Sequence, residues 1–157
     1  MAKFRYSMQS ILNIKLKLET QAKQEFSAAR AMLDEEERKL EALYERKDGY
    51  ERAARKLLEG ILDLRRIEEN KAAVRCMEDF ILLQKQNVAA AEQNLEAARQ
   101  RLTEVMMERK THERLKEKAF EEFLVEIKKE ESKEVDQLTS YTYGQRRSEE
   151  SRQHVPA

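Results

Sequence analysis

Apolar side chains recur at alternating steps of three and four residues along two long stretches of the chain. In the first stretch, ten of twelve repeat positions are apolar, and in the second stretch nine of ten are apolar. Since 40% of all residues are apolar, chance would fill fewer than half of these positions. The first seam is Phe26, Ala29, Leu33, Glu36, Leu40, Leu43, Lys47, Tyr50, Ala54, Leu57, Ile61 and Leu64, and the second seam is Val74, Met77, Ile81, Gln84, Val88, Ala91, Leu95, Ala98, Leu102 and Val105. Repeats of this kind are typical of long helices packed in a coiled coil.

The composition supports the same fold class. The chain has no proline before Pro156 and only three glycines, which leaves too few turn-forming residues for a β-sandwich or an α/β enzyme of 157 residues. Charged residues make up 39% of the chain, and strong helix formers dominate it. The prediction is an all-α protein, a long antiparallel two-helix coiled-coil hairpin occupying residues 1–141.

The two seams do not share one register, and this mismatch predicts where the chain turns. Continuing the first seam beyond Leu64 would place charged residues at the next repeat positions. We expect helices over about 4–60 and about 68–140, with a turn over about 61–67 that Gly60 opens and with Asn70 as the cap of the second helix. The polar residues 142–157 are predicted to be a disordered tail.

Each seam also has an expected extension toward the chain ends. Before the first seam, the repeat predicts packing positions at Phe4, Met8, Ile11, Leu18 and Ala22, with a stutter near Ala22. After the second seam, the repeat weakens and then resumes at Leu115, Ala119, Phe123 and Ile127. The second helix is therefore expected to extend beyond the first.

No residue pattern in the chain predicts catalysis. His112 and His154 are the only histidines, Cys76 is the only cysteine, and the glycines are too scattered for a phosphate-binding loop. A formal net charge of zero argues against nucleic-acid binding. The longest strongly apolar run, Phe80–Leu83, is far too short to span a bilayer. We therefore expect a cytosolic protein that is not an enzyme and has no metal and no cofactor.

Two surfaces are expected to bind partners. Residues 1–18 carry four basic and no acidic side chains beside an apolar face, which fits an acidic partner, an ordinary coiled-coil end or, less well, an anionic membrane. Near the turn, several apolar residues lie off the seams and exceed what two helices can cover. These residues are Tyr44, Phe80, Leu82 and Leu83.

Three features of the sequence resemble the FliJ family of flagellar export proteins. The opening Phe4-Arg5-Tyr6-Ser7-Met8-Gln9-Ser10-Ile11-Leu12, followed by Lys15, Glu19 and Ala22, is similar to the aromatic, aromatic, Gln and Leu opening of the family. Residues 133–138, Lys-Glu-Val-Asp-Gln-Leu, resemble a second family signature near the end of the chain. The length and the hairpin layout match over about residues 1–141.

The resemblance implies a stalk of the type III export apparatus that is similar to the central gamma subunit of rotary ATP synthases. Its expected partners are the hexameric export ATPase FliI, the export gate protein FlhA and export chaperones, with no nucleic acid. Its expected location is cytoplasmic, peripheral on the cytoplasmic side of the cell membrane and reaching that membrane only through the gate. The alternatives are the stalk of a virulence type III secretion system and an unrelated coiled-coil scaffold.

The resemblance also implies which residues make these contacts. The end that carries both chain termini would enter the ATPase ring, and a face nearer the turn would contact the gate. The implied gate contacts are Leu43, Tyr50 and Phe80, whereas Arg46, Gln84, Asn87 and Ala91 stand where the family has other residue types. The implied ATPase contacts are Phe4, Tyr6, Met8, Gln9, Leu12, Phe120, Phe123 and Ile127.

Overall fold

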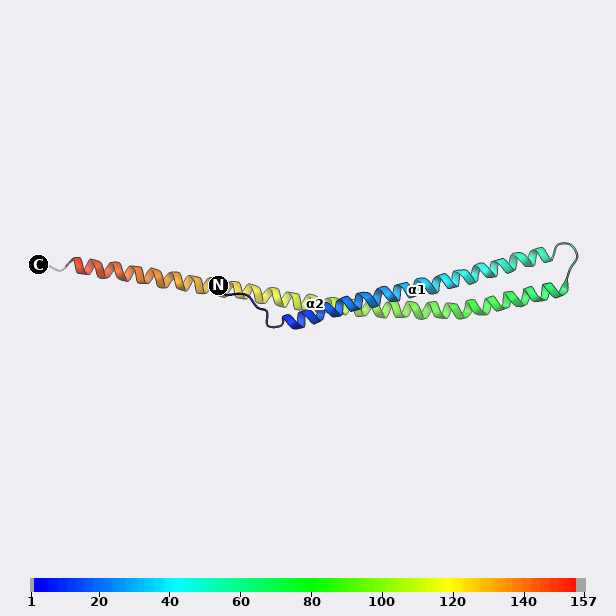
Figure 1. Ribbon diagram of the computed structural model, residues 1–157, viewed down its shortest axis with the longest axis horizontal. Coiled ribbons are helices and arrows are strands. Elements are labelled where there is room, and N and C mark those ends of the chain that lie inside the picture. Colours follow the sequence, from blue (N-terminus) through cyan, green and yellow to red (C-terminus); the bar gives the residue numbers. More distant parts are fainter. Residues whose placement is uncertain (1, 155–157) are drawn as a thin grey trace. The chain divides into compact units, whose positions relative to one another are not determined.

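The computed structural model describes residues 2–154 and confirms the predicted fold class. Within this range the chain forms two helices, α1 (Gln9–Leu57) and α2 (Leu64–Gln153), joined by the turn at residues 58–63 (Figure 1). Contacts between the helices pair Glu25 with Arg101, Lys47 with Glu78 and Asn70 with Tyr50. Because residue numbers rise along one helix as they fall along the other, the two helices form an antiparallel hairpin.

The chain divides into two units, one formed by Lys15–Glu108 and the other by Met1–Ile14 with Arg109–Ala157. The unit Lys15–Glu108 contains the turn and the parts of α1 and α2 that flank it. There the second seam packs as predicted, and the first seam does so as far as Leu57, whereas its last two predicted positions, Ile61 and Leu64, are exposed. Every position from Phe26 to Leu57 in the first seam is half-buried, and every position from Val74 to Val105 in the second seam is buried or half-buried.

The turn lies a few residues earlier than predicted. α1 ends at Leu57 rather than near residue 60. Just beyond this end, the amides of Leu58 and Glu59 donate to carbonyls three residues back. Gly60 then takes a φ of 76°, which favours glycine and reverses the chain direction. Asp63, and not Asn70, caps α2, because its Oδ1 accepts a hydrogen bond from the Arg65 amide at 3.1 Å.

The N-terminal boundary was also predicted too early. α1 begins at Gln9 instead of residue 4, and the Gln9 amide donates to the Tyr6 carbonyl at 3.1 Å. The preceding segment is not helical, and within it the Phe4 ring packs against rings of α2. One turn further on, Leu12 is buried and Ile11 is exposed, so the packing position is one residue later than predicted.

At the C-terminal end, the prediction of a disordered tail over residues 142–157 is wrong for residues 142–153. α2 continues to Gln153, and only residues 155–157 of the predicted tail lie outside the described residues. Hydroxyl groups of Thr139, Thr142 and Ser151 donate to carbonyls four residues back, which is compatible with unbroken helix. No proline interrupts this stretch, although all of residues 128–153 are exposed.

Candidate partner-binding surfaces

The residues expected to contact the export gate lie on both helices of the unit Lys15–Glu108. Lys47 of α1 lies 3.7 Å from Glu78 of α2, and Glu36 bonds to Gln84, so Leu43 and Phe80 lie at the same level of the hairpin. Leu43 is half-buried in the first seam. Phe80, beside the buried seam residue Ile81, leaves 49% of its surface exposed. Phe80 is therefore the more accessible of this pair.

Tyr50 has a different environment from Phe80. Its side chain is half-buried, and its carbonyl accepts a hydrogen bond of 2.9 Å from the Asn70 side chain. This bond ties α1 to α2 near the turn. The other off-seam residues, Tyr44, Leu82 and Leu83, are exposed as expected, and Lys85 Nζ lies 5.9 Å from the centre of the Tyr44 ring.

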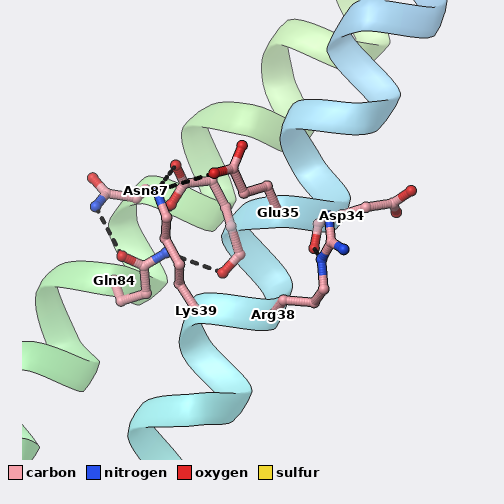
Figure 2. A network of polar contacts seen from close by, with 7 residues as sticks. Asp34, Glu35, Arg38, Lys39, Gln84 and Asn87 are labelled. Carbon is pink, nitrogen blue, oxygen red and sulfur yellow. Dashed lines mark hydrogen bonds and ion pairs between the residues drawn. The ribbon is translucent and has the colours of Figure 1, made fainter.

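A polar cluster interrupts the apolar seams beside these residues (Figure 2). Gln84, which is buried, donates from Nε2 to the Glu36 carbonyl at 3.0 Å and also to the Glu36 carboxylate. Asn87 Nδ2 donates in turn to Gln84 Oε1 at 3.1 Å. The cluster satisfies the polar atoms of Gln84 inside the hairpin, so it fixes the register of α1 against α2.

The charge on Glu36 is stabilised by this arrangement. The hydrogen bond from Gln84 is the main cause that lowers the pKa of the Glu36 carboxyl from its ordinary value, and Lys39 adds to the effect from 3.4 Å. Partial burial of the carboxyl acts in the opposite direction and does not outweigh them. The sequence carried a signal for this pair, because Glu36 is one of two polar positions in the first seam, with Lys47, and Gln84 is the one polar position in the second seam.

The residues expected to contact the ATPase lie in the other unit, where three of them form an aromatic cluster. The Phe4 ring meets Phe120 edge-on at 5.1 Å between centroids and Phe123 at 5.3 Å. Phe120 and Phe123, one helical turn apart on α2, lie 6.5 Å apart. This cluster holds the non-helical N-terminal segment against α2 and borders a groove of about 400 Å³.

The remaining predicted ATPase contacts differ in accessibility. Met8 is exposed, and Phe120 is 42% exposed. Gln9, Tyr6 and Ile127 are half-buried, and Gln9 Nε2 donates to Asn13 Oδ1 at 2.9 Å. Leu12 is only 4% exposed, so its side chain packs within the protein. The structure thus brings Phe4, Phe120 and Phe123 together and leaves Met8 and Phe120 most open to a partner.

The described residues show no arrangement suited to a metal ion. Residues 2–154 contain no group of three or more His, Cys, Asp or Glu side chains placed to bind a metal. Cys76 is exposed and not in a disulfide, and the buried His112 Nδ1 has no hydrogen-bond partner among these residues. Neither described helix has a stretch that is both long and apolar enough to cross a bilayer.

Comparisons with known proteins agree with this geometry. A solved structure described as a putative YscO homolog, CT670 from Chlamydia trachomatis, superimposes with a TM-score of 0.71 at 24% sequence identity, covering 93% of this chain and 99% of its own. At this identity the likeness shows the fold alone. No curated protein matches the chain. The family model of the flagellar FliJ proteins matches residues 4–148, and because this match spans most of the sequence, the chain belongs to the FliJ family.

Proposed function

We propose that this protein is a non-enzymatic stalk of the flagellar type III export apparatus that engages the export ATPase FliI and the export gate protein FlhA. The observation that carries the proposal is the FliJ family match over residues 4–148. The antiparallel hairpin supports it, because two packed helices offer partner surfaces but only a thin core. Export chaperones are proposed as additional partners, and the proposed location is the cytoplasmic side of the cell membrane.

The ATPase contact is proposed for the unit that contains the chain termini. Its aromatic cluster presents Phe120 at the surface, and Met8 is exposed on the first turn of α1. Lys3 and Arg5 line the groove beside the aromatic cluster together with Glu122 and Glu126 of α2, so charges of both signs border this surface. An apolar surface bordered by charges of both signs suits a partner that presents apolar side chains and complementary charges.

The gate contact is proposed for the Phe80 region of the other unit. Phe80 combines a large exposed ring with a position beside the rigid seam residue Ile81, which is the setting that favours an energetically important contact. Leu43 and Tyr50 are half-buried and are proposed to support the shape of this face. The polar residues Gln84 and Asn87 serve the hairpin itself, through their bonds to Glu36 and to each other.

A second candidate function has a specific observation in its favour. The solved neighbour is described as a putative YscO homolog rather than as a flagellar protein, which leaves room for the equivalent stalk of a virulence type III secretion system. The two candidates differ in which ATPase the protein stimulates. Presenting the protein to each ATPase in turn separates them.

The test is steady-state ATP hydrolysis by the cognate export ATPase over a concentration series of this protein. We expect saturable stimulation, and we expect Phe120→Ala to weaken it by about tenfold or more in half-saturating concentration. Phe80→Ala is the matched control, because its ring has a similar exposed fraction in the other unit. In a binding assay with the soluble portion of FlhA, Phe80→Ala should weaken binding and Phe120→Ala should serve as the control.

Two outcomes would contradict the proposal. If a ring-forming export ATPase shows no stimulation at any concentration, the stalk function is wrong. If the Phe120 and Phe80 variants impair both assays equally while their circular dichroism spectra match the wild type, the assignment of one partner to each unit is wrong.

A further inference from the structure

The turn between the helices exposes four large apolar side chains. Ile61 is 99% exposed, and Leu58, Leu62 and Leu64 each expose more than half of their surface. We call these four residues the apolar tip. Exposing several apolar side chains in one short segment is unfavourable in water, so the apolar tip is expected to be covered by something else when the protein works.

The hairpin does not use the apolar tip for its own packing. Leu57 and Ile67 are the half-buried residues that close the paired helices at this end. Ile61 and Leu64 continue the first seam in sequence, but the chain has already left α1 and finds no opposing helix for them. Leu58 partly lines a small apolar pocket with Leu57 and Ile67, whereas Ile61 packs against nothing comparable.

Basic residues surround the apolar tip. Residues 52–66 contain five basic and two acidic side chains, and three further acidic residues, Glu51, Glu68 and Glu69, lie just beyond this range. Arg55 and Lys56 stand in the last turn of α1, where positive charge suits the helix dipole. Arg65 and Arg66 stand at the start of α2, where positive charge opposes the dipole and where the helix has no acidic residue in its first turn. Interaction with the helix dipole therefore does not account for this arginine pair.

The arginine pair remains able to bind further anions. Arg65 Nε lies 3.3 Å from Glu69, and Arg66 Nε lies 3.7 Å from Asp63. Both contacts are exposed to solvent and so contribute little to stability. A guanidinium group has five N–H donors, and one carboxylate cannot use them all. Phosphate groups could accept the remaining ones.

We propose that the apolar tip docks this protein on the surface of an anionic lipid bilayer. Ile61 and its apolar neighbours enter the boundary between head groups and acyl chains, and the flanking arginine and lysine residues contact lipid phosphates. The charge pattern favours a lipid surface over an apolar protein groove, because basic residues flank the apolar tip on both helices. This inference goes beyond the proposed export function and does not depend on it.

Tryptophan fluorescence tests the proposal directly, because the chain has no tryptophan of its own. The full-length Ile61→Trp variant is mixed with vesicles of phosphatidylglycerol and phosphatidylethanolamine, and separately with vesicles of phosphatidylcholine alone. We expect a blue shift of the emission with the anionic vesicles only. Leu138→Trp is the matched control, because Leu138 is an exposed leucine on α2 in the other unit, and its emission should not shift.

Vesicle co-sedimentation with charge variants tests the basic residues. Arg65→Gln combined with Arg66→Gln should weaken binding to the anionic vesicles by about fivefold for each charge removed. Lys3→Gln combined with Arg5→Gln removes the same charge from the N-terminal segment and should leave binding unchanged. Ile61→Ser combined with Leu64→Ser should weaken binding by about tenfold or more. Circular dichroism checks that each variant keeps its helices.

Several outcomes would overturn the proposal. It fails if the wild type binds no anionic vesicles, or if the emission of the Ile61→Trp variant shows no blue shift with them. Equal binding to neutral vesicles would remove the role of the arginine pair. Loss of binding in the Lys3 and Arg5 variant alone would assign membrane contact to the N-terminal segment. If Ile61→Ser impairs binding to FlhA while no vesicle binds the wild type, the apolar tip is a protein contact instead.

Discussion

A single polar pair does more to specify the hairpin than its size suggests. Gln84 is buried, and its side-chain amide donates hydrogen bonds to the carbonyl and the carboxylate of Glu36 on the facing helix. An apolar residue at position 84 could pack against several neighbouring positions of α1. In the observed register the amide is satisfied by Glu36, and a shift would separate the two residues and cost Gln84 this partner. Gln84 is thus a register-setting residue within the apolar second seam.

The Glu36→Gln variant tests how much the charge of Glu36 contributes. The pKa of Glu36 is lowered in the folded protein, chiefly by the bond from Gln84. A lowered pKa means that the charged form stabilises the fold above the unfolded-state pKa, and that this stabilisation is lost as the pH falls through the folded-state pKa. We therefore expect Glu36→Gln to lower the melting temperature at neutral pH. The difference from wild type should begin to shrink below the ordinary value of 4.5 and close as the pH falls through the lowered folded-state pKa.

Thermal unfolding followed by circular dichroism at a series of pH values measures this difference. Glu37→Gln is the control, because Glu37 is the exposed neighbour of Glu36 and its substitution removes the same charge. The difference in melting temperature between Glu37→Gln and the wild type should stay constant over the pH series. A difference between Glu36→Gln and wild type that persists unchanged at acidic pH would show that the carboxylate charge has no part in the pairing.

At the scale of helices, periodicity predicts packing well and boundaries poorly. The seam positions between Phe26 and Leu57 follow from spacing, because a two-helix hairpin can bury only the apolar stripe of each helix that faces the other helix. Boundaries depend on single contacts that spacing does not record. Phe4 lies before the start of α1 with its ring against Phe120, and Asp63 caps α2 through one hydrogen bond. The prediction of a disordered tail is wrong because Gln145 and its neighbours are adequate helix formers even without burial.

The candidate surfaces were predictable to a similar degree. The exposure of Phe80 followed from its place beside the seam residue Ile81. The internal position of Leu12 did not follow, because the repeat near the N-terminus predicts Ile11 as the packing residue, whereas Leu12 is the buried one. Family resemblance supplied the expected partners, which neither spacing nor burial can name.

The neighbouring residues Ile81 and Phe80 separate packing from partner binding. Ile81→Ala removes buried apolar surface from the seam and should lower the free energy of unfolding by about 2–4 kcal/mol. Phe80→Ala removes a ring that is half exposed and should lower it by less than about 1 kcal/mol. Urea unfolding followed by circular dichroism in the helix band measures both values.

One outcome would contradict the assignment of Phe80 to an exposed partner surface. Equal loss of stability in the two variants would mean that Phe80 belongs to the core of the hairpin. The Phe80 face would then be a packing surface, and any weakened binding of the Phe80→Ala variant to FlhA would have to be attributed to unfolding.

For the whole molecule, burial is distributed unevenly along the chain. Most of the buried apolar residues, from Ala22 to Val105, belong to the unit Lys15–Glu108. Residues 128–153 of α2 are all exposed, although they remain helical. A helix without a packed face depends on its intrinsic propensity, which is marginal in water. The free energy of local opening should therefore fall steeply from the paired seams toward the end of α2.

Amide hydrogen exchange of the full-length protein, followed by mass spectrometry, tests this gradient. Peptides covering residues 77–105 should exchange slowest, because opening them breaks the seams, and peptides covering residues 128–153 should exchange fastest among the helical residues. Adding the export ATPase should slow exchange near Phe120 and along the exposed end of α2, since a partner would supply the missing packing. Peptides around the apolar tip serve as the internal control and should not change with the ATPase. Strong protection of residues 128–153 in the isolated protein would contradict the gradient and would indicate that another surface, such as a second copy of the chain, already covers this helix.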